Sequence, residues 1–349
     1  MIRSRRDMKL LHVETLTGGA LPEIALPAIL ADAECMRQAQ LADLAALPDA
    51  PEFAGGLRVS SLLDARLGLD TPAGIELHQV PAGTFPQVLQ RELLRSDAVW
   101  LTAPETGDQL ATLSRQVLDA GCRLLGSDVA TVRLCSSKLQ CVQWLVAHGV
   151  PCVPTLRDPR VWRDRALLRD GVIVKPDDGV GCEGQRRFDT FDRAWAWGQA
   201  ELGERAVYQP WVEGTPLSLS LLCADGRASL LSVNRQWIRE HDGALRLHGV
   251  TVGARGDADG TLARLAAAVA RALAGLWGHA GVDLVLGPAG PVVLEINPRT
   301  TLSYAGLREA LGLNPARALL DLPHLPHLPA PAHPSRSVRV ELAHAATTT

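Results

Sequence analysis

Two apolar segments near the carboxyl end of the chain constrain the fold most. GVDLVLG at 281–287 and PVVLEINP at 291–298 are separated by a short glycine- and proline-containing turn, which predicts two antiparallel neighbouring strands. Adjacent strands bring their side chains within reach across one face, so Asp283 and Glu295 are expected to lie close together. Strand alternation also puts Glu295, Asn297 and Arg299 on one face.

A buried strand is a costly place for a carboxylate, so these side chains need partners. The carboxylates of Asp283 and Glu295 and the amide oxygen of Asn297 are hard ligands, which suit Mg²⁺ bridged to nucleotide phosphates. The alternative interpretation places Asp283 at a solvated edge and pairs Glu295 with Arg299. The motif alone leaves both interpretations open.

Two lysines are candidate phosphate ligands. Lys175 ends the apolar segment GVIVKP at 171–176 and is followed by the loop DDGVGCEG, in which Gly179 and Gly181 allow backbone N–H groups to approach phosphate oxygens. Lys138 begins a predicted helix, an unfavourable place for a cation unless an anion is bound there. The alternatives are an ordinary glycine-rich turn and two solvated lysines.

The segment YQPWVEG at 208–214 is interpreted as a hinge that contacts a nucleotide base. From Gln209 onward its backbone would contact the edge of an adenine base. Trp211 and Val212 would line the pocket for the adenine ring, and Glu213 would lie near the ribose. The alternative is that Trp211 belongs to the core, as buried tryptophans commonly do.

A polar run interrupts a later strand region and supplies one further candidate. Arg235, within Asn234-Arg235-Gln236, is a possible clamp on a carboxylate or phosphoryl group. A surface strand explains the same run without any ligand.

Composition narrows the class of protein. A chain of 349 residues predicts two or three domains, and its net charge of −3 provides no basic surface for nucleic acid or for an anionic membrane. Its seven cysteines contain no CxxC pair, which favours a reduced, cytoplasmic setting. No apolar run reaches membrane-spanning length, and the basic start leaves either Met1 or Met8 as the first residue.

The first 130 residues alternate predicted strands with predicted helices, which indicates an open parallel α/β sheet.

Beyond this sheet, the order of candidate residues resembles the ATP-grasp superfamily over residues 130–310. That order is Lys138, Lys175 with its glycine loop, the hinge, Asp283 and EINPR. That resemblance implies two α+β lobes that hold ATP with Mg²⁺ or Mn²⁺. It implies phosphate contacts for both lysines, a lid role for the glycine loop, metal ligation by Asp283, Glu295 and Asn297, and a contact of Arg299 with the transferring group.

The resemblance also implies domain boundaries. Residues 8–130 would form the N-terminal α/β domain, 131–205 the first lobe with the lid, and 206–320 the second lobe with the metal site. The Pro-rich remainder, 321–349, is expected to be a mobile tail.

Shorter motifs resemble the tyramine–glutamate ligases of methanofuran synthesis and their bacterial relatives. These motifs are GGALPE at 18–23, APET at 103–106, LGSD at 125–128, VNRQW at 233–237 and EINPRTTLSYAGL at 295–307. The resemblance implies that the protein joins two small-molecule substrates, the γ-carboxyl of glutamate and an aromatic amine, through an acyl phosphate. It also implies a homodimer.

The alternatives to this function are an amino-acid or peptide ligase, a carboxylate kinase and a non-catalytic ATP-binding module. Pro216 and Leu217 stand where many such ligases have a ribose-binding acid, which leaves Glu213 as the nearby substitute.

Overall fold

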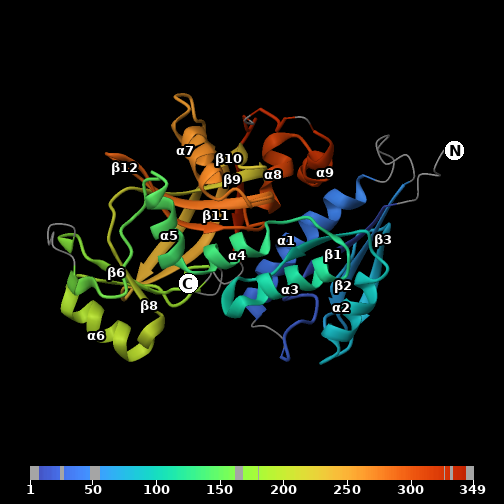
Figure 1. The fold of residues 1–349 in the computed structure, drawn as a ribbon, viewed down its shortest axis with the longest axis horizontal. Helices are drawn as coiled ribbons and strands as arrows, with labels where there is room; N and C mark the ends of the chain where they lie inside the picture. Colours follow the sequence, from blue (N-terminus) through green and yellow to red (C-terminus); the bar gives the residue numbers. More distant parts are fainter. Residues whose placement is uncertain are drawn as a thin grey trace.

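The computed structural model describes residues 8–23, 27–47, 56–161, 168–179, 181–325, 327–330 and 333–342. It contains two β-sheets, each with helices packed against it (Figure 1). The first sheet lies at the right of Figure 1, the lobe that carries α6 (Phe191–Glu201) lies at the left, and the long strands of the second sheet lie between them.

The first sheet has five parallel strands in the order β3-β2-β1-β4-β5. The strands are β1 (Met8–Glu14), β2 (Leu57–Asp64), β3 (Ile75–Val80), β4 (Ala98–Thr102) and β5 (Arg123–Leu124). Side-chain alternation divides the core: Leu10 of β1 packs with α1 (Pro27–Ala45), whereas Leu11 packs with α2 (Phe85–Leu93) and α3 (Gln109–Asp119). The predicted open parallel sheet is therefore confirmed.

The second sheet has nine strands, eight of them in the order β13-β12-β9-β10-β11-β7-β6-β8, with β14 paired to β11. The bounds are β6 (Val172–Pro176), β7 (Arg186–Phe188), β8 (Ala206–Pro210), β9 (Thr215–Ala224), β10 (Arg227–His241), β11 (Ala244–Arg255), β12 (Gly278–Gly287), β13 (Gly290–Asn297) and β14 (Val338–Glu341). All of its ladders are antiparallel, which short hairpin connections allow.

Helices cover the second sheet and join it to the first. The remaining α-helices are α4 (Val129–Ser136), α5 (Lys138–Ala147), α7 (Thr261–Ala272), α8 (Tyr304–Leu311) and α9 (Pro315–Asp321), and the short 3₁₀ turns are η1 (Thr106–Asp108), η2 (Pro159–Val161), η4 (Gly203–Arg205) and η5 (Leu322–His324). The apolar side chains of α7 recur at helical spacing and pack with α5 on strands β9, β10, β12 and β13. No helix in the described ranges has the length and apolar character needed to cross a bilayer.

The expectation of a mobile tail over 321–349 is wrong for its last described part. Residues 338–341 form β14, which pairs with β11 from Gly249 to Val252. Val340 and Leu342 are buried against the sheet, because the alternating apolar residues of VRVEL match the period of a strand. Residues 343–349 lie outside the described ranges.

An aromatic cluster joins the two sheets. The ring of Trp100, on β4, stacks on His279 of β12 with 6.1 Å between ring centres, and Tyr304 of α8 packs edge-on against both rings. Trp100 donates a hydrogen bond to Thr300, and His279 Nε2 lies 3.1 Å from the carbonyl oxygen of Pro315. Burial lowers the pKa of His279 to about 4, and the contact with Pro315 only partly opposes it.

We predict that His279 makes the fold sensitive to acid. Its pKa is depressed in the folded state, so the unfolded chain binds the extra proton, and stability is lost as pH falls from about 6.5 towards 4. Between pH 7 and pH 5 this site should cost about 2 kcal/mol. Between pH 7 and pH 5, the free energy of unfolding of His279→Gln, measured by urea titration, should therefore fall by less than that of the wild type. The exposed His241→Gln is the matched control, and identical pH slopes for all three proteins would contradict the prediction.

Candidate functional site

The structure confirms that two carboxylates lie side by side. Asp283 of β12 is the direct cross-strand partner of Glu295 on β13, and we refer to these two residues as the acidic pair. Asn297 Nδ2 donates to Asp283 Oδ2 over 3.3 Å, and Gln236 Nε2 of β10 donates to Asp283 Oδ1 over 3.0 Å. Gln236 was missed by sequence reasoning, which chose Arg235 from the same run.

Both candidate lysines face the acidic pair. Lys138 Nζ lies 3.4 Å from Glu295 Oε2. On β6, Val172 and Val174 pack under α6, so alternation directs Lys175 to the opposite face of the strand, where it is buried. Burial, with the charge of Lys138, lowers the pKa of Lys175 to about 8, although Glu295 partly opposes the shift.

The two carboxyl groups of the acidic pair have pKa values displaced in opposite directions. Burial raises the pKa of Asp283 to about 7, and the neighbouring charge of Glu295 adds to the shift. Burial also acts on Glu295, but Lys138 and Lys175 outweigh it and hold the Glu295 pKa below its ordinary value. Two carboxylate charges this close repel each other. A cation bound between their oxygens would therefore lower the electrostatic free energy of the pair.

The residues of the acidic pair fit a divalent cation. Glu295 Oε2 is buried and makes no well-aligned hydrogen bond within the residues that the structure describes. Its contact with Lys138 Nζ, at 3.4 Å, is an ion pair, so the oxygen keeps capacity for a further ligand. Within the same ranges, no group of three or more His, Cys, Asp or Glu side chains is arranged to hold a metal. Two carboxylates and one amide suit Mg²⁺, which commonly takes only one or two carboxylates from the protein and completes its shell with phosphate and water.

A buried aspartate joins the segment after Lys175 to the start of α5, where Lys138 lies. Asp177 follows Lys175 by two residues, and its Oδ1 accepts a hydrogen bond from Leu139 N at the start of α5. Its Oδ2 accepts from Ser137 Oγ over 2.8 Å and from Arg157 over 2.7 Å. In the sequence this aspartate stands out only as the first residue of the loop DDGVGCEG. The available signal was the KPDD run immediately after a buried strand.

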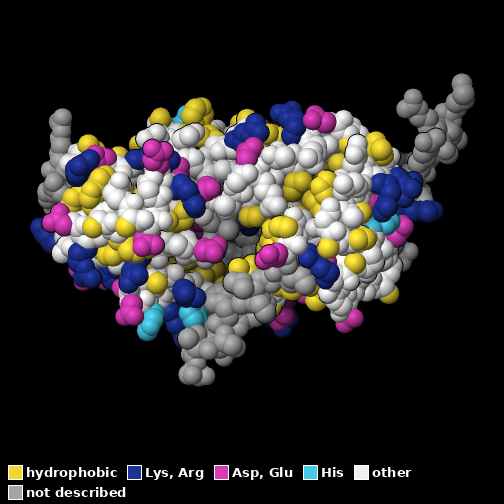
Figure 2. Space-filling view, turned by 90° about the horizontal axis from the view of Figure 1, so that it is seen from below, with side chains coloured by type: hydrophobic (Ala, Val, Ile, Leu, Met, Phe, Trp, Pro, Cys, Tyr) yellow, Lys and Arg dark blue, Asp and Glu magenta, His cyan; other side chains and the backbone are white. Residues whose placement is uncertain are grey.

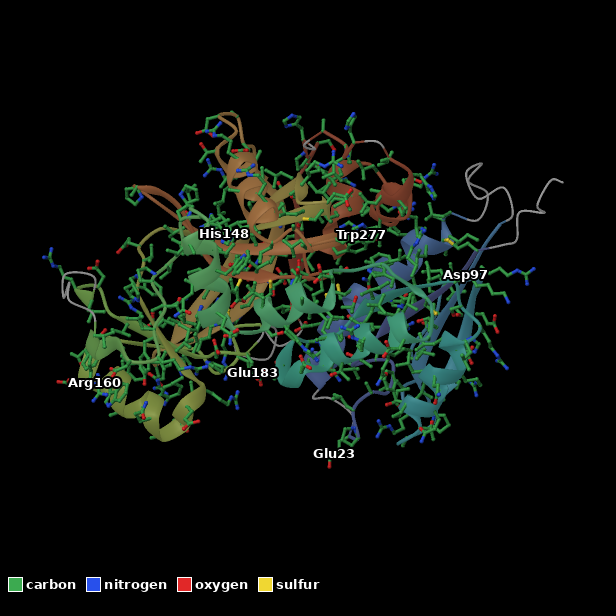
Figure 3. The ribbon with its side chains drawn as sticks, in the orientation of Figure 1. Glu23, Asp97, His148, Arg160, Glu183 and Trp277 are labelled. Carbon is green, nitrogen blue, oxygen red and sulfur yellow. The ribbon has the colours of Figure 1, made fainter. Side chains whose placement is uncertain are left out.

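The glycine-rich loop folds back over Lys138. The carbonyl oxygen of Gly179 accepts a hydrogen bond from Lys138 Nζ, and a side chain at position 179 would collide with the ring of Pro176. Gly181 has φ = 63°, in the left-handed region that favours glycine. Glu183 of this loop lies near the centre of the molecule in Figure 3, in the region between the two sheets.

The hinge runs from the end of β8 into the segment before β9. Gln209 is buried and donates to Thr155 Oγ1 over 2.8 Å. The ring of Trp211 is partly buried, and the guanidinium of Arg187 lies 4.2 Å from its centre, so one face of the ring is already covered. Val212 is half-buried, and Glu213 is exposed.

The two candidate arginines have other partners. Arg299 pairs with Glu105, with 2.9 Å between Nη2 and Oε2. Glu105 belongs to the domain of the first sheet, which we call the first domain. The alternative interpretation, in which Glu295 pairs with Arg299, is therefore wrong. Arg235 lies over the ring of Trp237, and because the adjacent Gln236 points to Asp283, alternation directs Arg235 away from the acidic pair. The prediction that Arg235 joins this site is therefore wrong.

A shallow pocket opens beside Glu295, and we refer to it as the site pocket; its empty space, including the part open to solvent, is about 250 Å³. It brings together the first domain, α4, α5, the glycine-rich loop and the end of β13. Its lining residues are Glu105, Cys135, Ser136, Lys138, Asp178, Gly179, Glu295, Ile296 and Asn297. Figure 2 shows a hollow near the middle of the underside of the molecule, bordered by acidic side chains.

We predict that the acidic pair destabilises the unliganded fold at high pH. The Asp283 pKa is raised, so the folded state resists ionisation, and stability falls as pH rises from about 4 to 7. Asp283→Asn removes this ionisation and should reduce the loss of folding stability between pH 5 and pH 8 by about 3 kcal/mol in urea titrations. As a control, Asp64→Asn should destabilise, because it breaks the pair with Arg66. An unchanged pH dependence in Asp283→Asn would contradict the prediction.

Comparison with known proteins agrees with this geometry. Residues 57–132 match the pre ATP-grasp 3 domain, and residues 135–303 match the ATP-grasp domain. The chain is 25% identical over 221 residues to the tyramine–L-glutamate ligase of Methanocaldococcus jannaschii. That alignment covers 62% of this chain and 61% of the length of the relative.

Solved structures share the fold. An ATP-grasp superfamily protein from Archaeoglobus fulgidus superposes with a TM-score of 0.70 at 22% identity, covering 96% of this chain and 92% of that chain. The L-amino acid ligase from Bacillus licheniformis superposes with a TM-score of 0.62 at 17% identity, covering 90% and 73%. From the two consecutive domain matches and the shared fold, we conclude that the chain belongs to the ATP-grasp superfamily.

Proposed function

We propose that this protein is an ATP-dependent, ADP-forming ligase that joins a carboxylate to an amine. The observation that carries the proposal is the acidic pair. Two adjacent carboxylates are faced by the buried Lys175 and by Lys138, whose Nζ lies 3.4 Å from Glu295 Oε2. A metal-bound triphosphate needs carboxylates to hold the metal and lysines to neutralise the phosphates.

Each group has a role in this proposal. Asp283, Glu295 and Asn297 would hold Mg²⁺ or Mn²⁺, which when bound would neutralise charge on the transferring phosphoryl group. Lys138 would exchange its contact with Glu295 for a phosphate, and Lys175 would contact a second one. The backbone around Gly179 and Gly181 would close over these phosphates as a lid.

The base would bind at the hinge, beside residues 209–212. Gln209 and Val212 would border the adenine, and the face of Trp211 that Arg187 leaves uncovered would line its ring pocket. Glu213 would reach the ribose only by moving inward from its exposed position. We further propose residues 131–205 and 206–320 as the two lobes that hold ATP between them.

The chemistry follows from the weak electrophilicity of a carboxylate. A carboxylate oxygen would attack the γ-phosphorus, the bond to the β,γ-bridging oxygen would break, and ADP would leave. The amine nitrogen would then attack the carbonyl carbon of the acyl phosphate, lose a proton and expel phosphate. The net reaction converts acid, amine and ATP into amide, ADP and phosphate. The protein contributes positioning and charge neutralisation, with Arg299 close to the reacting groups.

For substrates, we propose the γ-carboxyl of L-glutamate and tyramine or a related aromatic amine, in the synthesis of a methanofuran-type coenzyme. The matched relative supports this choice, because it is a tyramine–L-glutamate ligase. The sequence motifs through which this chain resembles such ligases include the EINPR segment, which carries the proposed metal ligands Glu295 and Asn297.

We predict that Glu295→Ala abolishes ADP formation. Loss of a metal ligand should raise the barrier by on the order of 3 kcal/mol, which corresponds to a rate decrease of at least about 100-fold. A coupled assay for ADP checks this, and circular dichroism verifies the fold. Glu309→Ala removes an exposed glutamate of α8 and should retain activity. Normal turnover and metal dependence in Glu295→Ala would remove Glu295 from the mechanism.

We predict that ADP release requires both L-glutamate and tyramine. A ligase needs the amine to discharge the acyl phosphate, whereas a carboxylate kinase would release ADP with the acid alone. The measurement is steady-state ADP formation with each substrate omitted in turn, repeated over a panel of acids and amines. If no pair stimulates ATP use, the ligase proposal fails.

A further inference from the structure

Glu105 belongs to the first domain but lines the site pocket. It follows β4, immediately before the 3₁₀ turn η1, and its side chain is only 6% exposed. The next residue, Thr106, donates a hydrogen bond to the carbonyl oxygen of Asp178 in the glycine-rich loop. Glu105 is therefore held at the junction between the first domain and the ATP-grasp domain.

Arg299 uses only one of the two oxygens of Glu105. Its Nε and Nη2 both donate to Oε2, over 3.1 and 2.9 Å, whereas a guanidinium fork commonly binds both oxygens of a carboxylate. Oε1 is buried and has no hydrogen-bond partner among the residues described. Leaving such an acceptor unsatisfied costs about 1–3 kcal/mol, so the position is costly unless a ligand supplies a donor.

The surroundings of Glu105 determine what kind of donor fits. Glu295 and Asp178 also line the pocket, so a carboxylate or phosphate group is repelled from Oε1. The donors of Lys138 are directed to the carbonyl oxygen of Gly179 and towards Glu295. Arg299 already places one positive charge on the same carboxylate, which disfavours a divalent cation more than a singly charged ammonium. An ammonium also supplies directed N–H donors.

We infer that Glu105 Oε1 binds the ammonium group of a substrate in the site pocket. This inference rests on the proposed ligase function and adds a specificity-determining residue to it. Oε2 keeps Arg299 in place, and Oε1 selects a substrate that carries an amino group. The ammonium has two sources, the α-ammonium of an amino-acid substrate and the amine that is to be joined.

The test compares Glu105→Gln with the wild-type enzyme. Glutamine keeps the shape of the side chain but removes its charge, and a charge-assisted hydrogen bond is the stronger kind. We expect the KM for one ammonium-bearing substrate to rise about 10-fold or more, with the KM for ATP and the Mg²⁺ requirement changed less than about twofold. Glu92→Gln is the matched control, because Glu92 is also buried and ion-paired in the first domain but does not line the pocket.

Two arms distinguish the sources of the ammonium. Glutarate has the carboxyl groups of glutamate but no α-ammonium. If Glu105 holds the α-ammonium, glutarate should have the same KM in Glu105→Gln and in the wild type, and only glutamate should be affected. If Glu105 holds the amine, the KM for tyramine should rise with either acid.

The outcomes that overturn the inference are separate from failure of the ligase proposal. Unchanged KM values for every ammonium-bearing substrate, in an active enzyme, would overturn the inference alone. A raised KM for ATP or an altered Mg²⁺ requirement would assign Glu105 to the nucleotide or metal site instead. Absence of ADP formation by the wild-type enzyme with any acid and amine would refute the ligase proposal, and the inference would fall with it.

Discussion

The site depends on the repulsion between two adjacent carboxylates. Cross-strand pairing of β12 and β13 places Asp283 beside Glu295. Because protein encloses both side chains, water screens the repulsion between their charges less than it would at the surface. The chain offsets part of this cost with Lys138 and Lys175, and the pKa values move accordingly, upward for Asp283 and downward for Lys175. Without a ligand, the two adjacent carboxylates repel each other. In the proposed function, a metal cation would match the acids and its phosphates would match the lysines.

Four distant parts of the chain must meet for this site to form. The start of α5 supplies Lys138, and Asp177 joins that helix to the loop after β6 through hydrogen bonds to Ser137 and Leu139. The first domain supplies Glu105, which reaches Arg299 just beyond β13. The stacked rings of Trp100 and His279 hold the same two regions together from within the core. The parallel sheet therefore contributes to the pocket as well as to stability.

Local patterns in the sequence predicted the parts of the fold that depend on nearby residues. The short turn before β13 was sufficient to predict the Asp283–Glu295 pair, and strand–helix alternation predicted the first sheet. Contacts between distant segments had no comparable signal in the sequence. Arg299 pairs with Glu105, which lies 194 positions away, and not with the nearby Glu295. Arg235 was chosen over Gln236 because charge suggests function, although strand alternation decides which of the two faces the site. The alternation in β14 was present in the sequence but was outweighed by the prolines before it.

The most direct test of the central claim is a crystal structure with a non-hydrolysable ATP analogue and Mg²⁺. The account predicts a metal within about 2.1 Å of oxygens from Asp283 and Glu295, bridged to phosphates that Lys138 and Lys175 contact. Lys138 should have left Glu295 for a phosphate oxygen. A nucleotide bound elsewhere, with Lys138 still paired to Glu295 and no metal between the carboxylates, would contradict the account.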